Sequence, residues 1–289
     1  MRIFITGHTG FIGSNLVAYL ESLGHTIVGC SRKEGCDADD FDSVALKLRD
    51  CDLAYHLAAD ARPAESILSP WETLNTNLKT TSNVGLACSR AKVPLVYVSS
   101  CEIYGDSRTQ ITEDSPLAPT NPYAASKLAG DRLLYSFYRC YNLDVKMPRL
   151  FNPYGPHQQL NKIIPTFYKL AKQNLPLTVY GDGTDTRDYV YIDDIVRGLW
   201  EARRLSSGDA VNLATGVMTT NKQVAEMIVR KTGSRSEVRF ASYPSVFGGI
   251  HNQVGSNSKA MKILSWIPKV SLEAGIDNTL KWLESVDCA

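Results

Sequence analysis

Three glycines, spaced three residues apart, follow the first apolar run of the chain. Residues 2–6 form that run, Gly7, Gly10 and Gly13 follow it, and a helical pattern covers residues 14–22. Glycines in such a turn let the backbone bend tightly and approach a pyrophosphate, and the N-terminus of the next helix attracts negative charge. This way of binding a pyrophosphate requires a turn from a strand into a helix, which is where these glycines lie. The feature therefore predicts a dinucleotide-binding α/β protein, with a structural turn as the alternative.

Short apolar runs alternate with helical patterns through the first half of the chain. This alternation predicts a parallel sheet covered on both faces, and near-continuous apolar strands suit that burial. We expect a Rossmann-type doubly wound parallel sheet. The predicted strands are 2–6, 26–30, 53–57, 95–99 and 144–149, and the predicted helices are 14–22, 43–49, 73–91 and 124–141.

The second half breaks this rhythm after a turn cluster at residues 152–156. We expect helices at 162–172, 195–204, 221–232 and 272–285, with short apolar stretches at 178–180 and 189–192. These elements predict a smaller C-terminal α/β substrate-binding cap. The expected division places residues 1–152, with about 186–215, in the dinucleotide-binding domain, and residues 153–185 and 216–289 in the cap.

Composition and charge exclude several classes of protein. Of 289 residues, 44% are hydrophobic, and the formal net charge is +1. This composition supports a folded core and gives no strong field for nucleic acid or an anionic membrane. The N-terminus does not resemble a signal peptide, and no stretch approaches the roughly 20 apolar residues of a membrane span. We expect a cytoplasmic protein that binds neither nucleic acid nor membranes.

The seven cysteines are scattered along the chain and form no C-x-x-C pair. The five histidines show no metal-ligand spacing. We therefore expect no metal site and no redox dithiol, and the cysteines are predicted to be reduced thiols, mostly small buried side chains.

The second predicted strand lacks the carboxylate that commonly binds the ribose of NAD. The strand ends Gly29-Cys30-Ser31-Arg32. Arg32 could meet the 2′-phosphate of NADP, or it could be a solvated surface residue. The choice between NAD and NADP therefore stays open on physical grounds.

Tyr123 and Lys127 lie four residues apart at the start of a predicted helix, and so on one helix face. An ammonium beside a phenol favours the phenolate and lowers a pKa that is normally about 10. Tyr123 is therefore predicted to accept a proton from a sugar or alcohol hydroxyl.

Together with the glycine turn, this pair resembles the extended short-chain dehydrogenase/reductases, the NAD-dependent sugar-nucleotide epimerase/dehydratase family. The resemblance runs through nearly the whole chain, and its motifs occur in the family's order. It implies NAD as cofactor, a nucleotide-sugar substrate and a homodimer formed through a four-helix contact. The cofactor-binding residues that it implies are Gly7, Gly10, Phe11, Ile12, Gly13, Ser31, Arg32, Asp37, Leu57, Ala58, Ala59, Asn77, Tyr123 and Lys127.

The same resemblance assigns roles at the reacting centre. Ser100 hydrogen-bonds the hydroxyl being oxidised, Tyr123 takes its proton, and Lys127 holds the phenolate and the nicotinamide ribose. Asn152 and Arg187 match the positions that contact the substrate diphosphate, and the planar fork of an arginine suits that group. The resemblance implies no metal. The cofactor carries out the hydride transfer, and the protein positions the substrate and supplies the charged groups around it.

The residues after Ser100 distinguish this chain within the family. Ser100-Cys101-Glu102 keeps the glutamate of the Thr-Asp-Glu triplet of 4,6-dehydratases and replaces the aspartate with cysteine. Glu102 is predicted to remove the C5 proton, and Cys101, a thiol with a pKa near 8.5, to protonate the departing C6 hydroxyl. A small core cysteine and a structural salt bridge are the structural alternatives.

The triplet most resembles that of a sugar-nucleotide 5,6-dehydratase, so the leading prediction is a UDP-hexosamine 5,6-dehydratase. A 4,6-dehydratase, a 4-epimerase and a UDP-glucuronate decarboxylase use the same oxidation and stay open. A dinucleotide-sensing regulatory protein is the non-enzymatic alternative.

One departure from the family pattern concerns the residues that bind the substrate diphosphate. Many relatives carry a second arginine near the C-terminus, and the stretch 247–254 has none. We expect His251 or Asn252 to replace it.

Overall fold

The computed structural model describes residues 1–246 and 249–287. Its main sheet is parallel and follows the order β11-β6-β4-β3-β1-β2, with β5 also paired to β6. The expected Rossmann-type α/β fold is therefore confirmed. The strands are β1 (Arg2–Thr6), β2 (Thr26–Cys30), β3 (Leu53–His56), β4 (Leu95–Tyr97), β5 (Ser99–Ser100), β6 (Val145–Leu150) and β11 (Ala210–Leu213).

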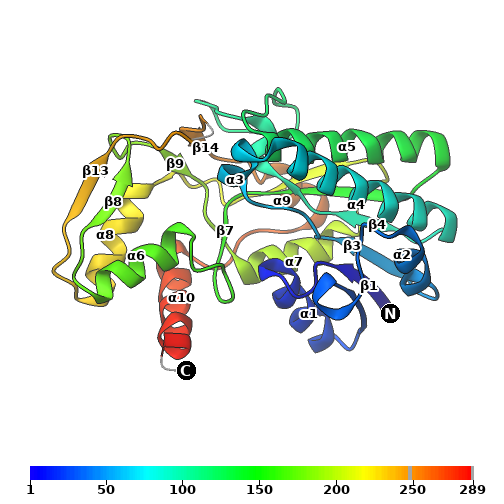
Figure 1. Ribbon diagram of the computed structural model, residues 1–289, viewed down its shortest axis with the longest axis horizontal. Coiled ribbons are helices and arrows are strands. Elements are labelled where there is room, and N and C mark those ends of the chain that lie inside the picture. Colours follow the sequence, from blue (N-terminus) through cyan, green and yellow to red (C-terminus); the bar gives the residue numbers. More distant parts are fainter. Residues whose placement is uncertain (247–248, 288–289) are drawn as a thin grey trace.

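Side chains along β1 alternate between two buried layers. Ile3 and Ile5 belong to one hydrophobic cluster and Phe4 belongs to the other. Figure 1 shows one layer of helices on each side of the sheet. Helices α1 (Phe11–Ser22) and α7 (Ile192–Ala202) contribute to the first cluster, and α2 (Phe41–Leu48), α4 (Pro70–Ala91) and α5 (Pro122–Tyr141) to the second.

Helix α5 begins two residues before the predicted start. The side-chain oxygen of Asn121 accepts a hydrogen bond from the Ala124 N–H at 2.8 Å, and Pro122 occupies the first helical turn. Proline suits this position because its fixed φ already matches the helix. The backbone N–H that it lacks would have no helical partner at a helix start in any case. The short helix α3 (Pro63–Leu68) was not predicted, since six residues give little helical periodicity.

The C-terminal part is built around two parallel strands, β8 (Leu177–Tyr180) and β13 (Val238–Ala241). They lie at the opposite end of the molecule from α2 (Figure 1). The surrounding helices are α6 (Ile163–Lys172), α8 (Asn221–Thr232) and α10 (Leu272–Asp287).

Two smaller sheets, with three strand pairings between them, connect this part to the main sheet. Strand β9 (Thr186–Arg187) pairs with β12 (Thr219–Thr220) and with β14 (Asn252–Gln253), and β7 (Pro153–Tyr154) pairs with β10 (Val190–Tyr191). The predicted division into two domains passes through all three pairings. It remains a proposal.

Residues after β14 return to the main sheet. Helix α9 (Ser258–Leu264) packs near β11, and the indole N–H of Trp266 donates to the Asp194 carbonyl of α7 at 3.0 Å. Trp266 is fully buried. The C-terminal region therefore packs against both β11 and α7.

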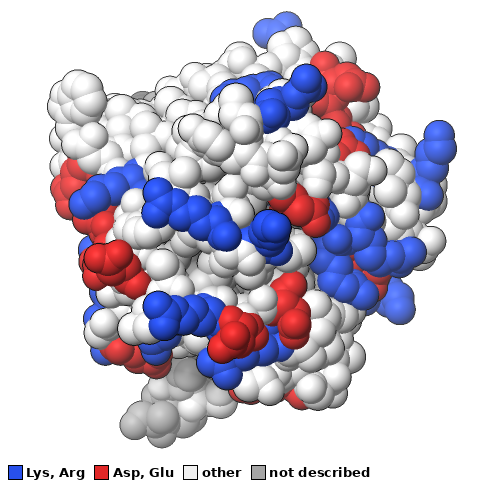
Figure 2. Space-filling view, turned by 90° about the vertical axis from the view of Figure 1, so that its right-hand side faces the viewer, with Lys and Arg blue, Asp and Glu red and all other residues white. Residues whose placement is uncertain are grey.

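The face shown in Figure 2 carries basic and acidic side chains interspersed with uncharged surface. Among the described helices, none is both long enough and apolar enough to cross a membrane.

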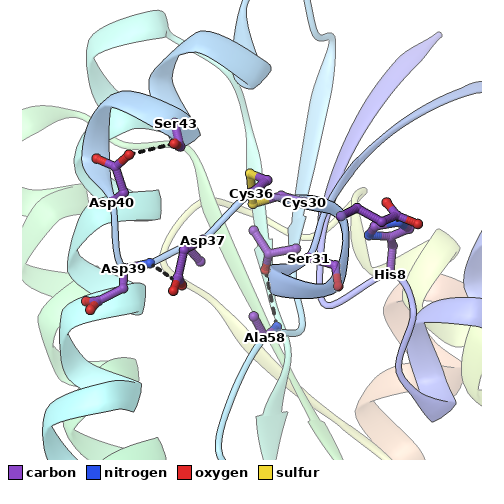
Figure 3. The surroundings of a disulfide bond; sticks show 12 residues. His8, Cys30, Ser31, Cys36, Asp37, Asp39, Asp40, Ser43 and Ala58 are labelled. Carbon is purple, nitrogen blue, oxygen red and sulfur yellow. Dashed lines mark hydrogen bonds and ion pairs between the residues drawn. A yellow bond between two sulfur atoms is a disulfide. The ribbon is translucent and has the colours of Figure 1, made fainter.

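A disulfide joins Cys30, the last residue of β2, to Cys36, six positions further on. Between them the 3-10 helix η1 (Arg32–Glu34) turns the chain back, and Gly35 takes a left-handed φ of 74°. Figure 3 shows the bond beside Ser31. The expectation of reduced thiols is wrong for this pair, because a turn and not a C-x-x-C spacing brings the sulfurs together.

Four other cysteines are free thiols, of which only Cys140 is exposed. Cys51, Cys88 and Cys101 are buried, as expected for small apolar side chains. Cys288 lies outside the described residues.

Candidate active site

A cavity of about 730 Å³ lies at the carboxyl ends of the main-sheet strands. Because parallel strands all end at one edge, residues that directly follow different strands converge there. Gly7 follows β1, Ser31 follows β2, Leu57 follows β3 and Asn152 follows β6 shortly after its end, and all four line the cavity. The structure thus brings together residues that lie between positions 7 and 152 of the sequence.

With one exception, every residue that the family resemblance assigns to the site lines this cavity. From the cofactor set, the lining residues are Gly7, Gly10, Phe11, Ile12, Gly13, Ser31, Arg32, Asp37, Leu57, Ala58, Ala59, Tyr123 and Lys127, and from the catalytic and substrate sets they are Ser100, Cys101, Glu102, Asn152 and Arg187.

Asn77 is the exception, and it acts from behind the cavity. Its side-chain oxygen accepts from the Asp60 N–H at 2.7 Å, and its amide nitrogen donates to the Ser126 hydroxyl at 2.8 Å. Ser126 in turn donates to the Tyr123 carbonyl. Asn77 therefore ties α4 to the first turns of α5, where Tyr123 lies.

The glycine turn leaves room that side chains would fill. Gly7 has φ +72°, and a Cβ on Gly13 would lie 2.1 Å from the Gly7 carbonyl oxygen. Gly10 caps α1 without a side-chain hydrogen bond. The first backbone N–H groups of α1 thus have no helical partners and lie at the cavity wall, an arrangement that fits a pyrophosphate.

No carboxylate stands directly at the end of β2. Ser31 accepts a hydrogen bond from the Lys33 N–H and contacts the Thr9 hydroxyl at 3.0 Å. Glu34 pairs with His8 at 2.8 Å, and neither residue lines the cavity. His8 therefore fills space beside the glycine turn, and Arg32 is a cation that borders the cavity at this strand end.

Ser100, Tyr123 and Lys127 lie together in the cavity wall. Burial raises the pKa of Tyr123. The nearby Glu102 carboxylate raises the same pKa further, whereas a hydrogen bond with Ser100 lowers it. Lys127, which is predicted to lower this pKa, is not among the main causes of the shift. The Lys127 ammonium lies 4.3 Å from the centroid of the Tyr97 ring instead.

Lys127 is itself buried, with a charged neighbour on the same helix. Burial lowers its pKa to about 8, and Asp131, one turn further along α5, raises it. Asp131 also pairs with Arg149 of β6 at 3.3 Å. This buried ion pair fixes α5 against the main sheet.

Glu102 lies in the 3-10 helix η2 (Cys101–Tyr104), directly after Ser100. The Asn121 amide donates to its carboxylate at 2.8 Å. Burial raises the pKa of Glu102, and the Asn121 hydrogen bond, Arg187 and Lys162 each oppose the rise. Asn121 therefore caps α5 through its oxygen and holds Glu102 through its nitrogen.

Cys101 faces the cavity from the same turn, yet only 2% of it is exposed. Its thiol donates to the side-chain oxygen of Gln253 at 3.0 Å. Burial raises the pKa of Cys101 well above its usual value, and Glu102 raises it further. The group is therefore a neutral thiol at neutral pH, as a proton donor must be.

The substrate side of the cavity contains unsatisfied polar atoms. Among the described residues, the side-chain oxygens of Asn152 and Gln158 are buried without a hydrogen-bond partner, and both residues line the cavity. Arg187 lines it too, and its guanidinium donates to the carbonyls of Thr186, Ile250 and His251. These groups could bind the polar part of a ligand.

His251 and Asn252 do not reach this cavity. They line a separate one of about 510 Å³ with Asp106, whose carboxylate accepts from both backbone N–H groups. Their position does not support the expected replacement of the missing arginine. Lys162, which the sequence reasoning missed, borders the main cavity beside Glu102. Phe247 and Gly248 of the same stretch lie outside the described residues.

Asn121 and Gln253 were also missed. Asn121-Pro122 before a helical pattern is a helix-start signal, so Asn121 could have been found. Gln253 is 152 positions from Cys101 and carries no comparable local signal. Within residues 1–246 and 249–287, no three His, Cys, Asp or Glu side chains come close enough together to hold a metal ion.

The fold and this cavity define a dinucleotide-binding enzyme with a Rossmann-type sheet. More narrowly, residues 3–214 match the model of the NAD dependent epimerase/dehydratase family, and the chain belongs to that family. It is therefore an NAD-dependent enzyme, and the alternative of a non-enzymatic sensor is set aside.

Its relatives catalyse more than one reaction. A UDP-glucose 4-epimerase of Mycolicibacterium smegmatis is 31% identical, with 99% of each chain covered. A UDP-glucuronic acid decarboxylase of Danio rerio is 29% identical over 97% of this chain and 72% of the relative. The solved dTDP-glucose 4,6-dehydratase of Streptomyces venezuelae, with NAD and TYD bound, has a TM-score of 0.91 and 28% identity, covering 99% of this chain and 97% of that one.

Proposed function

We propose that the protein is an NAD-dependent nucleotide-sugar dehydratase, and within that class a UDP-hexosamine 5,6-dehydratase. The observation that carries the proposal is the pair Cys101 and Glu102. Both line the cavity directly after Ser100, one as a neutral thiol and the other as a carboxylate held by Asn121. An epimerase needs neither an acid nor a base at C5 and C6.

The first half-reaction is oxidation at C4 of the sugar. Bound NAD supplies the hydride acceptor. Ser100 hydrogen-bonds the C4 hydroxyl, and Tyr123 accepts its proton. Burial raises the pKa of Tyr123 in the structure, so its phenolate needs positive charge nearby, which Lys127 on the same helix would supply.

The second half-reaction is loss of water across C5 and C6. The C4 ketone acidifies the C5 proton, which Glu102 removes. The C6–O bond breaks as Cys101 donates its proton, so the oxygen leaves as water and a C5=C6 double bond forms. The proton held by Glu102 then restores the Cys101 thiol, and the acid–base pair returns to its starting state.

The Ser-Cys-Glu triplet supports the 5,6-dehydratase over the 4,6-dehydratase. It resembles the UDP-N-acetylhexosamine 5,6-dehydratase of tunicamycin biosynthesis, and the proposal extends to antibiotic biosynthesis on that ground alone. In a 5,6-dehydratase the hydride returns to C4 and the exocyclic alkene remains. In a 4,6-dehydratase it is delivered to C6.

A panel of UDP-, dTDP- and GDP-sugars, incubated with the enzyme and analysed by mass, tests the reaction class. Loss of water from a hexose or hexosamine is the expected result. Loss of carbon dioxide from a uronate would indicate a decarboxylase, and an unchanged mass with inverted C4 would indicate an epimerase.

Substrate deuterated at C4 distinguishes the two dehydratases. We expect deuterium to remain at C4. Deuterium found at C6 would make the protein a 4,6-dehydratase.

We further propose a cytoplasmic homodimer formed through α4 and α5. On α5, Tyr135 and Tyr141 are exposed large side chains, 38% and 56% accessible, and an interface would cover them. Light scattering at micromolar concentration should give twice the chain mass. A monomer at every concentration would contradict the dimer.

A further inference from the structure

Gln253 is a buried glutamine whose side chain faces the turn that carries the proposed acid and base. It is 1% exposed, on strand β14. The thiol of Cys101 donates to its oxygen at 3.0 Å, and its nitrogen donates to the carbonyls of Cys101 and Gly105, at 2.9 and 3.2 Å. All three hydrogen bonds join Gln253 to η2 and the residue that ends it.

These contacts fix which way the carboxamide points. Two carbonyl oxygens accept hydrogen bonds and can face only the NH₂ group, so the amide oxygen must face the sulfur. An amide oxygen only accepts, and it would repel a thiolate. Gln253 therefore favours the protonated form of Cys101 and fixes the direction of its S–H bond.

The strand that carries Gln253 is also bound to the predicted diphosphate arginine. Gln253 lies opposite Arg187 in the parallel pairing of β14 with β9. The Arg187 guanidinium donates to the carbonyls of Ile250 and His251, three and two positions before Gln253 in the chain. A ligand that engages Arg187 would thus act on the segment that orients Cys101.

We propose that Gln253 is a positioning residue for the dehydration step, which holds Cys101 as a neutral thiol until the C6 hydroxyl departs. The proposal rests on the proposed function, because it assumes that Cys101 is the acid. It makes no demand on oxidation at C4 or on removal of the C5 proton, since Gln253 contacts none of Ser100, Tyr123 and Glu102 through a hydrogen bond among the described residues.

The test compares Gln253→Met with Gln110→Met. Methionine nearly matches glutamine in length and shape without its hydrogen bonds. Gln110 is the matched control, since its amide donates to the Gly255 carbonyl at 3.1 Å on the same segment but does not touch Cys101. For Gln253→Met we expect water loss to fall roughly 10- to 100-fold, as for a lost hydrogen bond, and C5 exchange in deuterated water to stay within about threefold. Gln110→Met should leave both rates near wild type.

A conservative variant, Gln253→Glu, adds a rescue test. When protonated, the introduced carboxyl can donate to a carbonyl and accept from the thiol, so it copies the amide. When ionised, it can only accept. The ratio of variant to wild-type water loss should therefore rise on acidification, and the ratio for Gln253→Met should not.

Alkylation of Cys101 by iodoacetamide, followed against pH by peptide mass mapping, gives a readout that needs no substrate. The midpoint should move to lower pH in Gln253→Met, because the amide oxygen no longer opposes the thiolate. An unchanged midpoint, or an equal fall of water loss and C5 exchange, would show that Gln253 merely packs the turn. If wild-type protein dehydrates no sugar, the proposed function fails, but the alkylation midpoint still decides whether Gln253 controls the thiol.

Discussion

At the scale of single residues, the site depends on burial as much as on charge. Lys127 and Cys101 are buried, Tyr123 and Glu102 are partly buried, and burial is the largest cause of the pKa shift of each. Burial keeps the acid Cys101 protonated, which suits its proposed role. Burial also disfavours the ionised phenolate of Tyr123. Ionisation of this residue therefore depends on positive charge nearby.

Replacing Tyr123 with phenylalanine removes the proton acceptor of the oxidation. Turnover should fall roughly 10²–10⁴-fold, the range for a general acid–base group, while substrate affinity changes little. Steady-state kinetics with a competent sugar nucleotide measures both. Near-normal turnover of Tyr123→Phe would remove this residue from the mechanism.

Glu102 and Cys101 should affect different steps. In Glu102→Gln, oxidation at C4 should persist while exchange of the C5 proton with deuterated water is abolished, since no base remains. In Cys101→Ala, C5 exchange should persist while water loss collapses. The two rates, measured by mass on one substrate, separate the roles. If both variants lose both rates together, the assignment of acid and base is wrong.

At the scale of elements, the start of α5 serves both the helix and the base. Asn121→Ser keeps a side-chain cap but loses the donor to Glu102. Burial raises the pKa of Glu102 and Asn121 opposes the rise, so the variant's carboxyl should have a higher pKa. Because the base must be ionised, the acidic limb of the C5-exchange profile should move to higher pH. An unmoved limb would contradict the role of Asn121.

The loop closed by Cys30 and Cys36 is a second such element. It carries Ser31 and Arg32 to the cavity wall, so Cys36→Ser should weaken NAD binding as well as stability. Loop-closure entropy for so short a loop gives a loss of about 2 kcal/mol in the free energy of unfolding. Denaturant unfolding and calorimetry measure the two effects. Cys140→Ser, at an exposed free thiol, is the control and should change neither.

At the scale of the whole molecule, the strand ends meet at one cavity, which would hold the dinucleotide. At a concentration 100 times its Kd, NAD should stabilise the fold by about 2.7 kcal/mol, and the protein should purify with part of it bound. We expect NAD to bind more tightly than NADP, although Arg32 borders the cavity. Titration calorimetry compares them, and a tenfold preference for NADP, about 1.4 kcal/mol, would reverse the assignment.

Local spacing was enough to predict much of this molecule. The glycine turn, the order of strands and helices in the first half and the Tyr123–Lys127 pair are set by residues close together in the chain. Boundaries were less exact where a cap or a proline starts the helix, as at α5. The predicted site residues meet at one edge because parallel strands end there, which is a property of the fold class itself.

Contacts between distant segments were decided only by the tertiary structure. The hydrogen bond from Cys101 to Gln253 spans 152 positions, and Trp266 reaches Asp194 across 72. The Cys30–Cys36 bond depends on a turn that no spacing rule predicted. The sequence by itself determined the sheet, the cofactor turn and the candidate reacting side chains, because these follow from periodicity and short motifs. The tertiary structure decided what holds those side chains in place, because partners brought together by folding leave no periodic signal in the chain.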